Sequence, residues 1–172
     1  RAEDGKWALF RPGLLALVLG AVGYGVVALV TRVLRAELGI VEGSSDIVAS
    51  AFSILITGPL AESARVLSVV LPPRSKELRR PYDAMRLSFG AAIGFATASA
   101  IARVATTPID VLLAIRVALG FVSHVSLSGL WGFAIGRERR RTGGGRGFQR
   151  SFLAATLFGS GAENRLFEQG KL

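Results

Sequence analysis

The sequence predicts an all-α protein, a polytopic bundle of transmembrane helices with four clear spans and a short or incomplete fifth. Three observations favour this class: 51% of the 172 residues are hydrophobic, only 19% are charged, and the mean hydropathy is +0.47. Such a chain is too apolar for a disordered protein or an ordinary soluble globule. It has no cysteine, which excludes disulfide scaffolds and cysteine nucleophiles. Its single histidine disfavours a metal centre built from histidines. We therefore treat residues 1–172 as a single membrane domain.

The four spans correspond to apolar runs that are long enough to cross about 30 Å of hydrocarbon, which takes about 20 helical residues. We predict them at about residues 14–31, 47–71, 84–105 and 109–136. No small-residue cleavage pattern follows the first run, so we expect a retained span and not a signal peptide. A fifth run, at about 151–158, is too short to cross a bilayer by itself.

Charges between the spans predict the orientation. The loop 72–86 has five basic and two acidic residues, and the loop 137–150 has six basic residues and one acidic residue. The loop 32–46 has two basic and three acidic residues instead. Because short cytoplasmic loops are enriched in Lys and Arg, we place the N-terminus and both basic loops in the cytoplasm. The expected location is the bacterial inner membrane.

The same basic loops indicate partners. Arginine clusters beside a membrane usually contact anionic lipid headgroups, so the lipid bilayer is the first expected partner. Nucleic acid is disfavoured, because the run Arg137–Arg141 lacks interleaved aromatic residues for base stacking. The spacing of Gly90 and Gly94 favours close helix packing, within the chain or against other membrane proteins. Phe95 and Trp131 are interpreted as packing or interface residues.

Ionisable residues inside the spans are the candidates for function, since such groups usually face a protein interior or water. Glu62 and Arg65 lie three residues apart, so they share a helical face and can pair. Pro59, about one turn earlier, removes a backbone donor and predicts a kink beside them. Arg116 and His124 lie eight residues apart on about one face of the fourth span. Together these groups indicate a small polar cavity; a self-neutralising structural pair is the plainer alternative.

The order of these features resembles the PrsW-type intramembrane protease family, which belongs with the CAAX prenyl endopeptidase-like glutamic membrane proteases. The resemblance covers roughly residues 47–158. The stretch 58–65, GPLAESAR, is similar to the family's first motif, a Glu pair followed after two residues by Lys. The stretch 90–99, GAAIGFATAS, is similar to its Gly-rich second motif, Phe-xxx-Glu.

The later motifs are also similar. Arg116 and His124, followed by the stretch 132–136, GFAIG, look like the family's Arg…His span with its Gly-Tyr-Ala-Leu-Gly-like end. The stretch 153–158, LAATLF, is similar to the lead-in to its last motif, His-xxx-Asp. The resemblance therefore rests on four motifs in the same order.

The chain departs from the family pattern mainly at carboxylates. Ala61 stands where the family has the first Glu of its pair, and Ser99 where it has the Glu of the second motif. Arg65 keeps the charge of the family's Lys. By spacing, the last motif falls near Gly159 and Glu163, so its His is absent.

These matches and departures together predict a PrsW-like integral membrane protein that is catalytically degenerate. It would bind or scaffold other membrane proteins or transmembrane peptides through an intramembrane polar cavity. If it is active, the resemblance and the chemistry of peptide hydrolysis make Glu62 the base and His124 a hydrogen-bond donor, with Arg65, Ser99 and Arg116 around the cavity.

Cofactors and other functions follow from the same residues. Glu62 and His124 are the only plausible metal ligands in the spans, too few for a closed site, so no cofactor is expected, and a metal ion is kept as the alternative. Three alternatives stay open: an active intramembrane protease, a structural subunit of a larger membrane complex, and a proton or ion pathway.

Overall fold

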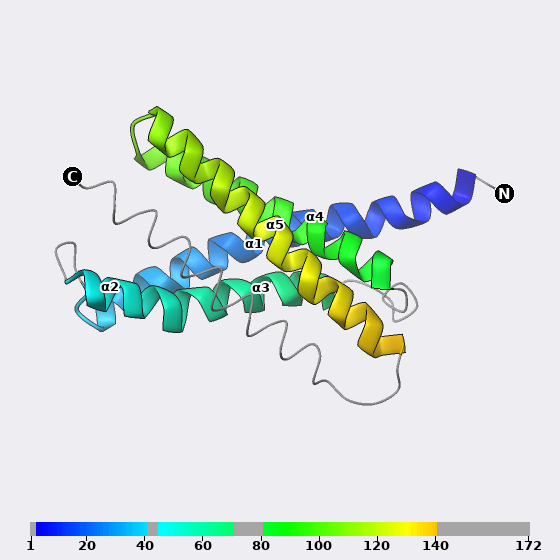
Figure 1. The fold of residues 1–172 in the computed structure, drawn as a ribbon, viewed down its shortest axis with the longest axis horizontal. Helices are drawn as coiled ribbons and strands as arrows, with labels where there is room; N and C mark the ends of the chain where they lie inside the picture. The colour runs from blue at the N-terminus through cyan, green and yellow to red at the C-terminus, as the bar shows by residue number, and fades with distance from the viewer. Residues whose placement is uncertain (1–2, 41–44, 71–80, 141–172) are drawn as a thin grey trace.

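The computed structural model describes the backbone of residues 3–40, 45–70 and 81–140, and every element in these ranges is a helix. The predicted all-α class is therefore confirmed. The elements in order are α1 (Glu3–Glu37), α2 (Asp46–Phe52), the π-helical turn η1 (Ser53–Thr57), α3 (Gly58–Val70), α4 (Pro81–Thr106) and α5 (Val111–Arg140) (Figure 1).

Four helical stretches are long and apolar enough to cross a membrane. They are Pro12–Glu37, Ile47–Val70, Pro81–Thr106 and Val111–Arg137. The second is continuous through α2, η1 and α3. The levels at which the bilayer meets these helices, and so the span bounds given above, stay predictions. The short run 151–158, most of the basic loops 72–86 and 137–150, and the last-motif position lie outside the described residues.

An irregular turn interrupts the second span just before the candidate site. The π-helical turn Ser53–Thr57 directly precedes Gly58 and Pro59. Pro59 has no N–H to donate to the carbonyl one turn earlier, and a wider turn is one way in which a helix adjusts to such a gap. A π-helical turn is thus present next to Pro59, while the kink itself stays a prediction.

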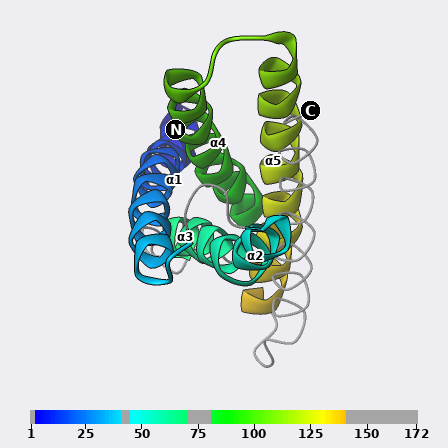
Figure 2. The same cartoon turned by 90° about the vertical axis from the view of Figure 1, so that its left-hand side faces the viewer.

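Helix α4 is the central element of the bundle. It packs along both α1 and α5, and α3 contacts α1 and α4 (Figure 2). Small residues permit the closest approach, between α1 and α4. A methyl group at Gly20 would overlap the carbonyl oxygen of Ala91, and one at Gly94 would overlap that of Leu17. Gly94 therefore serves packing within the chain.

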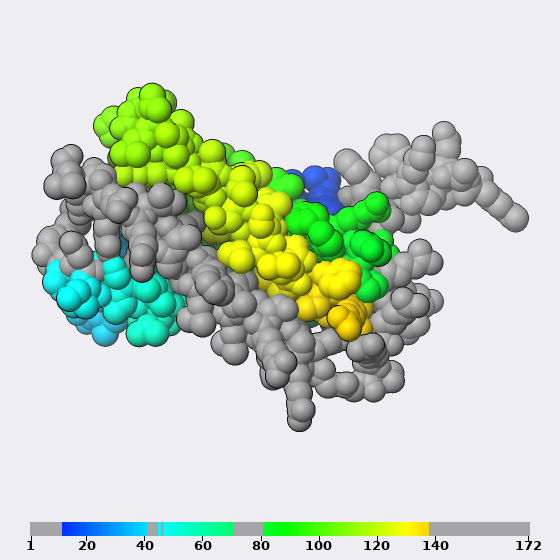
Figure 3. All heavy atoms as spheres, viewed as in Figure 1, coloured from blue at the N-terminus to red at the C-terminus, as the bar shows by residue number. Residues whose placement is uncertain are grey.

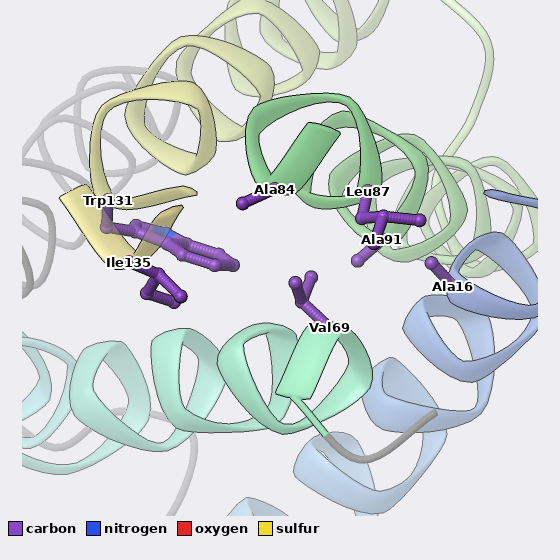
Figure 4. Packing of buried hydrophobic residues seen from close by; sticks show 7 residues of the cluster. All are labelled: Ala16, Val69, Ala84, Leu87, Ala91, Trp131 and Ile135. Atoms are coloured by element: carbon purple, nitrogen blue, oxygen red, sulfur yellow. The ribbon is translucent and has the colours of Figure 1, made fainter. Parts of the chain in front are cut away.

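The core near this crossing combines three alanines with larger apolar side chains. The central cluster consists of Ala16, Val69, Ala84, Leu87, Ala91, Trp131 and Ile135 (Figure 4). Large apolar side chains point outward instead on every span, for example Leu29, Leu55, Ile101 and Leu130, each more than 60% exposed. Helix α5, drawn in yellow-green, lies on the outer surface of the molecule (Figure 3). This apolar surface, with four helices of spanning length, identifies an integral membrane protein.

Candidate functional site

An ion pair is buried inside the bundle on α3. Arg65 Nη2 donates a hydrogen bond to Glu62 Oε1 at 2.6 Å, and neither side chain is more than 3% exposed. Arg65 Nε also donates to the carbonyl of Ala61, one turn earlier, at 3.4 Å. The three-residue spacing thus produces the pair that it predicts, and helix α3 alone supplies both charges.

The other carboxylate oxygen of Glu62 is held from α5. Trp131 Nε1 donates to Glu62 Oε2 at 3.1 Å, and the indole is fully buried. Because each carboxylate oxygen has its own donor, Glu62 is fixed between two helices. The carboxylate is therefore part of the packing of α3 against α5.

Phe95 of α4 connects this ion pair to the histidine. The Arg65 guanidinium carbon lies over the Phe95 ring, 5.0 Å from its centroid. The ring of His124 contacts Phe95 with centroids 5.5 Å apart and planes at 69°, and Tyr24 contacts it with centroids 5.4 Å apart. Phe95 therefore packs directly against two of the predicted site residues.

A cavity of about 660 Å³ lies among the four spans, next to this aromatic cluster. Its size is typical of ligand sites, which are commonly about 300–1,000 Å³. His124 and Ser99 line it, as does Ala61. Glu62 and Arg65 are not among the described residues that line it. The structure therefore divides the predicted site residues between a closed ion pair and an accessible cavity.

Arginines surround part of this cavity. Arg32 and Arg35 come from α1, Arg103 comes from α4, and all three line it. Arg35 also lies over the ring of Phe52, 5.2 Å from the centroid. Among the described residues of the lining there is no Asp or Glu. The described part of the lining thus carries three arginines and no carboxylate.

The remaining predicted residue, Arg116, lies at a second and much smaller cavity between α4 and α5. This cavity measures about 10 Å³, close to the space that one water needs. Ser99, Arg103, Arg116 and His124 all line it. The structure thus brings Arg116, His124 and Ser99 together, on the side of α4 that faces α5.

The described residues do not fit a resident metal ion. Within residues 3–40, 45–70 and 81–140 there is no group of three His, Cys, Asp or Glu side chains that could hold one. The one buried carboxylate near the centre, Glu62, already accepts hydrogen bonds from Arg65 and Trp131. The donor set in this part of the chain is therefore arranged for an ion pair and not for a metal.

The role of Trp131 is the main feature that the sequence interpretation missed. Phe95 and Trp131 both pack as expected. Trp131 also donates a hydrogen bond to the carboxylate of Glu62, although the two residues are 69 positions apart in the sequence. One signal was present in the sequence. An indole N–H within a membrane span needs an acceptor, and Glu62 is an acidic acceptor in a neighbouring span.

Comparison with known proteins gives one finding. The model of a family described as PrsW family intramembrane metalloprotease matches residues 10–161 of the chain. No match was found among curated proteins or among solved structures. The matched residues include all four described spans and every residue of the two cavities.

Proposed function

Because this chain belongs to the PrsW family of intramembrane metalloproteases, we propose that it is a member without catalytic activity that holds a stretch of other membrane proteins in its cavity. It is an intramembrane protease-like integral membrane protein. The observation that carries the proposal is the state of Glu62, whose two oxygens accept from Arg65 and Trp131.

Peptide hydrolysis by water needs a general base that can reach the water. Glu62 is 1% exposed and already accepts hydrogen bonds from Arg65 and Trp131, so its carboxylate is closed off from a reacting water. The resemblance puts two further carboxylates at positions 61 and 99, and here these are Ala61 and Ser99. Both line the large cavity, so the chain has apolar and hydroxyl groups where the family pattern has acids. This arrangement supports binding in place of cleavage.

The volume of the cavity limits what it can hold. A spanning helix about 30 Å long and 10 Å wide occupies roughly 2,400 Å³. The cavity measures about 660 Å³, so it takes a few residues of an unwound or extended segment and not a whole helix. We accordingly propose that the guest is a locally extended stretch of a partner's membrane segment.

The proposal includes no metal and no other cofactor. It is supported by the donor set of the described residues, which lacks a three-ligand group. Binding of a guest peptide is therefore expected to be the same with a chelator as with added Zn²⁺. A binding signal that needs Zn²⁺ and disappears with the chelator would contradict this part of the proposal.

Binding and cleavage can be measured together in liposomes, with a synthetic single-span peptide that has a Gly-Pro pair in its apolar segment and one cysteine beside it. The chain has no cysteine of its own, so a single one can be introduced at will. Ala28 lines the cavity, whereas its neighbour Leu29 is 64% exposed and serves as the matched control. We expect disulfide crosslinking of the peptide to Ala28→Cys, little to Leu29→Cys, and no peptide fragments by mass spectrometry.

Cleavage by the unmodified chain would overturn the proposal. If Glu62→Gln then abolished it, the active-protease alternative would hold. Because that change leaves Arg65 buried without its carboxylate, His124→Asn provides a second variant that keeps the ion pair. Failure of the peptide to crosslink at Ala28→Cys would contradict the proposal that the cavity binds a peptide segment.

We also propose that the N-terminus faces the cytoplasm of a bacterial inner membrane, as the basic loops predict. The α1 end with Arg32 and Arg35 would then face the opposite side. In whole cells, Asp110→Cys is expected to react with a membrane-impermeant maleimide, and Arg137→Cys only after permeabilisation. The reverse pattern would reverse the orientation.

A further inference from the structure

Resting on the proposed function, we infer that the large cavity selects membrane segments with an acidic residue at the point where they leave the membrane. Arg32 and Arg35 would bind the carboxylate, with Arg103 in the same lining, and the apolar lining would hold the residues before it. The inference adds a class of partner to the proposed function and can fail without it.

Three arginines line the large cavity. Arg32 and Arg35 are three residues apart on α1, so they lie on one face of that helix, and Arg103 lines the same cavity from α4. Among the described residues that line the cavity there is no Asp or Glu side chain. A cleft that carries charge of one sign within low-dielectric walls concentrates ligands of the opposite sign.

The chemistry of the guanidinium group favours a carboxylate in particular. Arginine can donate two parallel hydrogen bonds to the two oxygens of a carboxylate. The contact of Arg35 with the Phe52 ring helps to hold its guanidinium at the cavity before a ligand arrives. A ligand that finds its partners already positioned loses less affinity to ordering.

The position of these arginines predicts where the acid lies in the guest. Arg35 lies in the last turn of α1, and Arg103 lies in the last turn of α4. Both helices therefore place a guanidinium at the end of a spanning helix. A guest segment would have its acidic residue at the same level, beside the apolar residues that enter the cavity.

The hydroxyl groups of the lining favour a peptide over a lipid chain. Thr57 lines the cavity, and its hydroxyl oxygen is buried without a hydrogen-bond partner among the described residues. Ser99 lines the same space from α4. An acyl chain has no group that can bond to a buried hydroxyl, whereas an extended peptide offers N–H and C=O groups along its length.

The test compares two single-span peptides that differ only at the end of the apolar segment, which carries Asp-Asp in one and Asn-Asn in the other. The unmodified protein is placed in liposomes of zwitterionic phosphatidylcholine, and affinity is measured by energy transfer from a labelled peptide. We expect the Asp-Asp peptide to bind at least tenfold more tightly. The double variant Arg32→Gln/Arg35→Gln should remove that difference and leave the Asn-Asn peptide unchanged.

A matched control removes the same charge elsewhere. Arg86 and Arg137 are exposed and do not line the cavity, so the double variant Arg86→Gln/Arg137→Gln should keep the tenfold preference. A charge exchange gives a second and independent readout. Arg32→Glu should improve binding of a peptide that ends in Lys-Lys.

Each other outcome overturns the inference. Equal binding of the Asp-Asp and Asn-Asn peptides refutes acid selection, while the proposed function stands. Binding of neither peptide refutes both. If liposomes with phosphatidylglycerol displace the Asp-Asp peptide, and a labelled anionic lipid crosslinks to Ala28→Cys, the cavity is a lipid site and not a peptide site.

Discussion

The four helices meet closely at one end of the bundle and enclose a cavity toward the other. At the closed end, α1 and α4 cross at Gly20 and Gly94, and alanines such as Ala84 and Ala91 are fully buried (Figure 4). At the open end, the same helices carry Tyr24, Phe95 and the cavity arginines. The size and charge of the side chains thus decide where this bundle closes and where it opens.

Glu62 and Arg65 lie between the closed end and the open end. Glu62 bonds to Trp131, which belongs to the closed core, and to Arg65, which packs on Phe95 at the edge of the cavity. The ion pair thus lies at the boundary between the two ends. The predictions below test this division through the stability of each end.

The largest effect is expected from breaking the buried ion pair. Glu62→Leu leaves Arg65 buried without its carboxylate, and loss of one partner of such a pair costs about 3–5 kcal/mol. Glu62→Leu/Arg65→Met removes both charges and should recover most of that loss. Denaturant unfolding in detergent micelles measures both. Glu37 is exposed, so Glu37→Gln is the control. If Glu62→Leu were as stable as Glu37→Gln, the ion pair would not contribute to the stability of the fold.

A smaller loss is expected from the donor on α5. Trp131→Phe keeps an aromatic ring but leaves Glu62 Oε2 without its hydrogen bond, and hydrogen bonds to charged groups contribute about 1.5–3 kcal/mol. In the Glu62→Leu/Arg65→Met background, Trp131→Phe should lower the free energy of unfolding by less, since no carboxylate remains at position 62. An equal cost in both backgrounds would mean that Trp131 acts through packing alone.

The helix crossing at the closed end predicts a comparable but purely steric effect. A methyl group at Gly94 would overlap the Leu17 carbonyl oxygen, so Gly94→Ala should force α1 and α4 apart at a cost of about 1–3 kcal/mol. Gly25, also on a span, has nothing within 4 Å of an added methyl group. Gly25→Ala should therefore leave the unfolding free energy unchanged or raised. Similar losses at both glycines would point to backbone flexibility instead of close packing.

Much of the closed end could be predicted from local sequence. The spans follow from the lengths of the apolar runs, and the Glu62–Arg65 pair follows from helical periodicity. Pro59 also marked the region next to which the π-helical turn lies, although a kink was expected there and not a π-helical turn. Each of these depends on residues within a few positions of one another, where the geometry of a helix already sets the distances.

The open end could not be predicted in the same way. Arg32, Arg35 and Arg103 look like ordinary residues at the ends of spans, and only the packing of α1 against α4 brings them to one cavity. Thr57 lies at the end of the π-helical turn, and its hydroxyl oxygen is buried without a hydrogen-bond partner among the described residues, which local sequence did not indicate. Such features depend on how helices are placed relative to one another, and the sequence pattern of one helix contains no information on that.

The smallest effect on stability is expected at the open end, where we propose that the arginines bind a guest. Arg35→Gln removes the contact with the Phe52 ring, and at exposed sites such contacts contribute about 0.5–1 kcal/mol. Arg32→Gln, three residues earlier and also exposed, should change the unfolding free energy by less than about 0.5 kcal/mol. Both variants should weaken binding of the Asp-Asp peptide. If either destabilised the fold as much as Trp131→Phe, the cavity arginines would belong to the structural core, and the division between a closed and an open end would not hold.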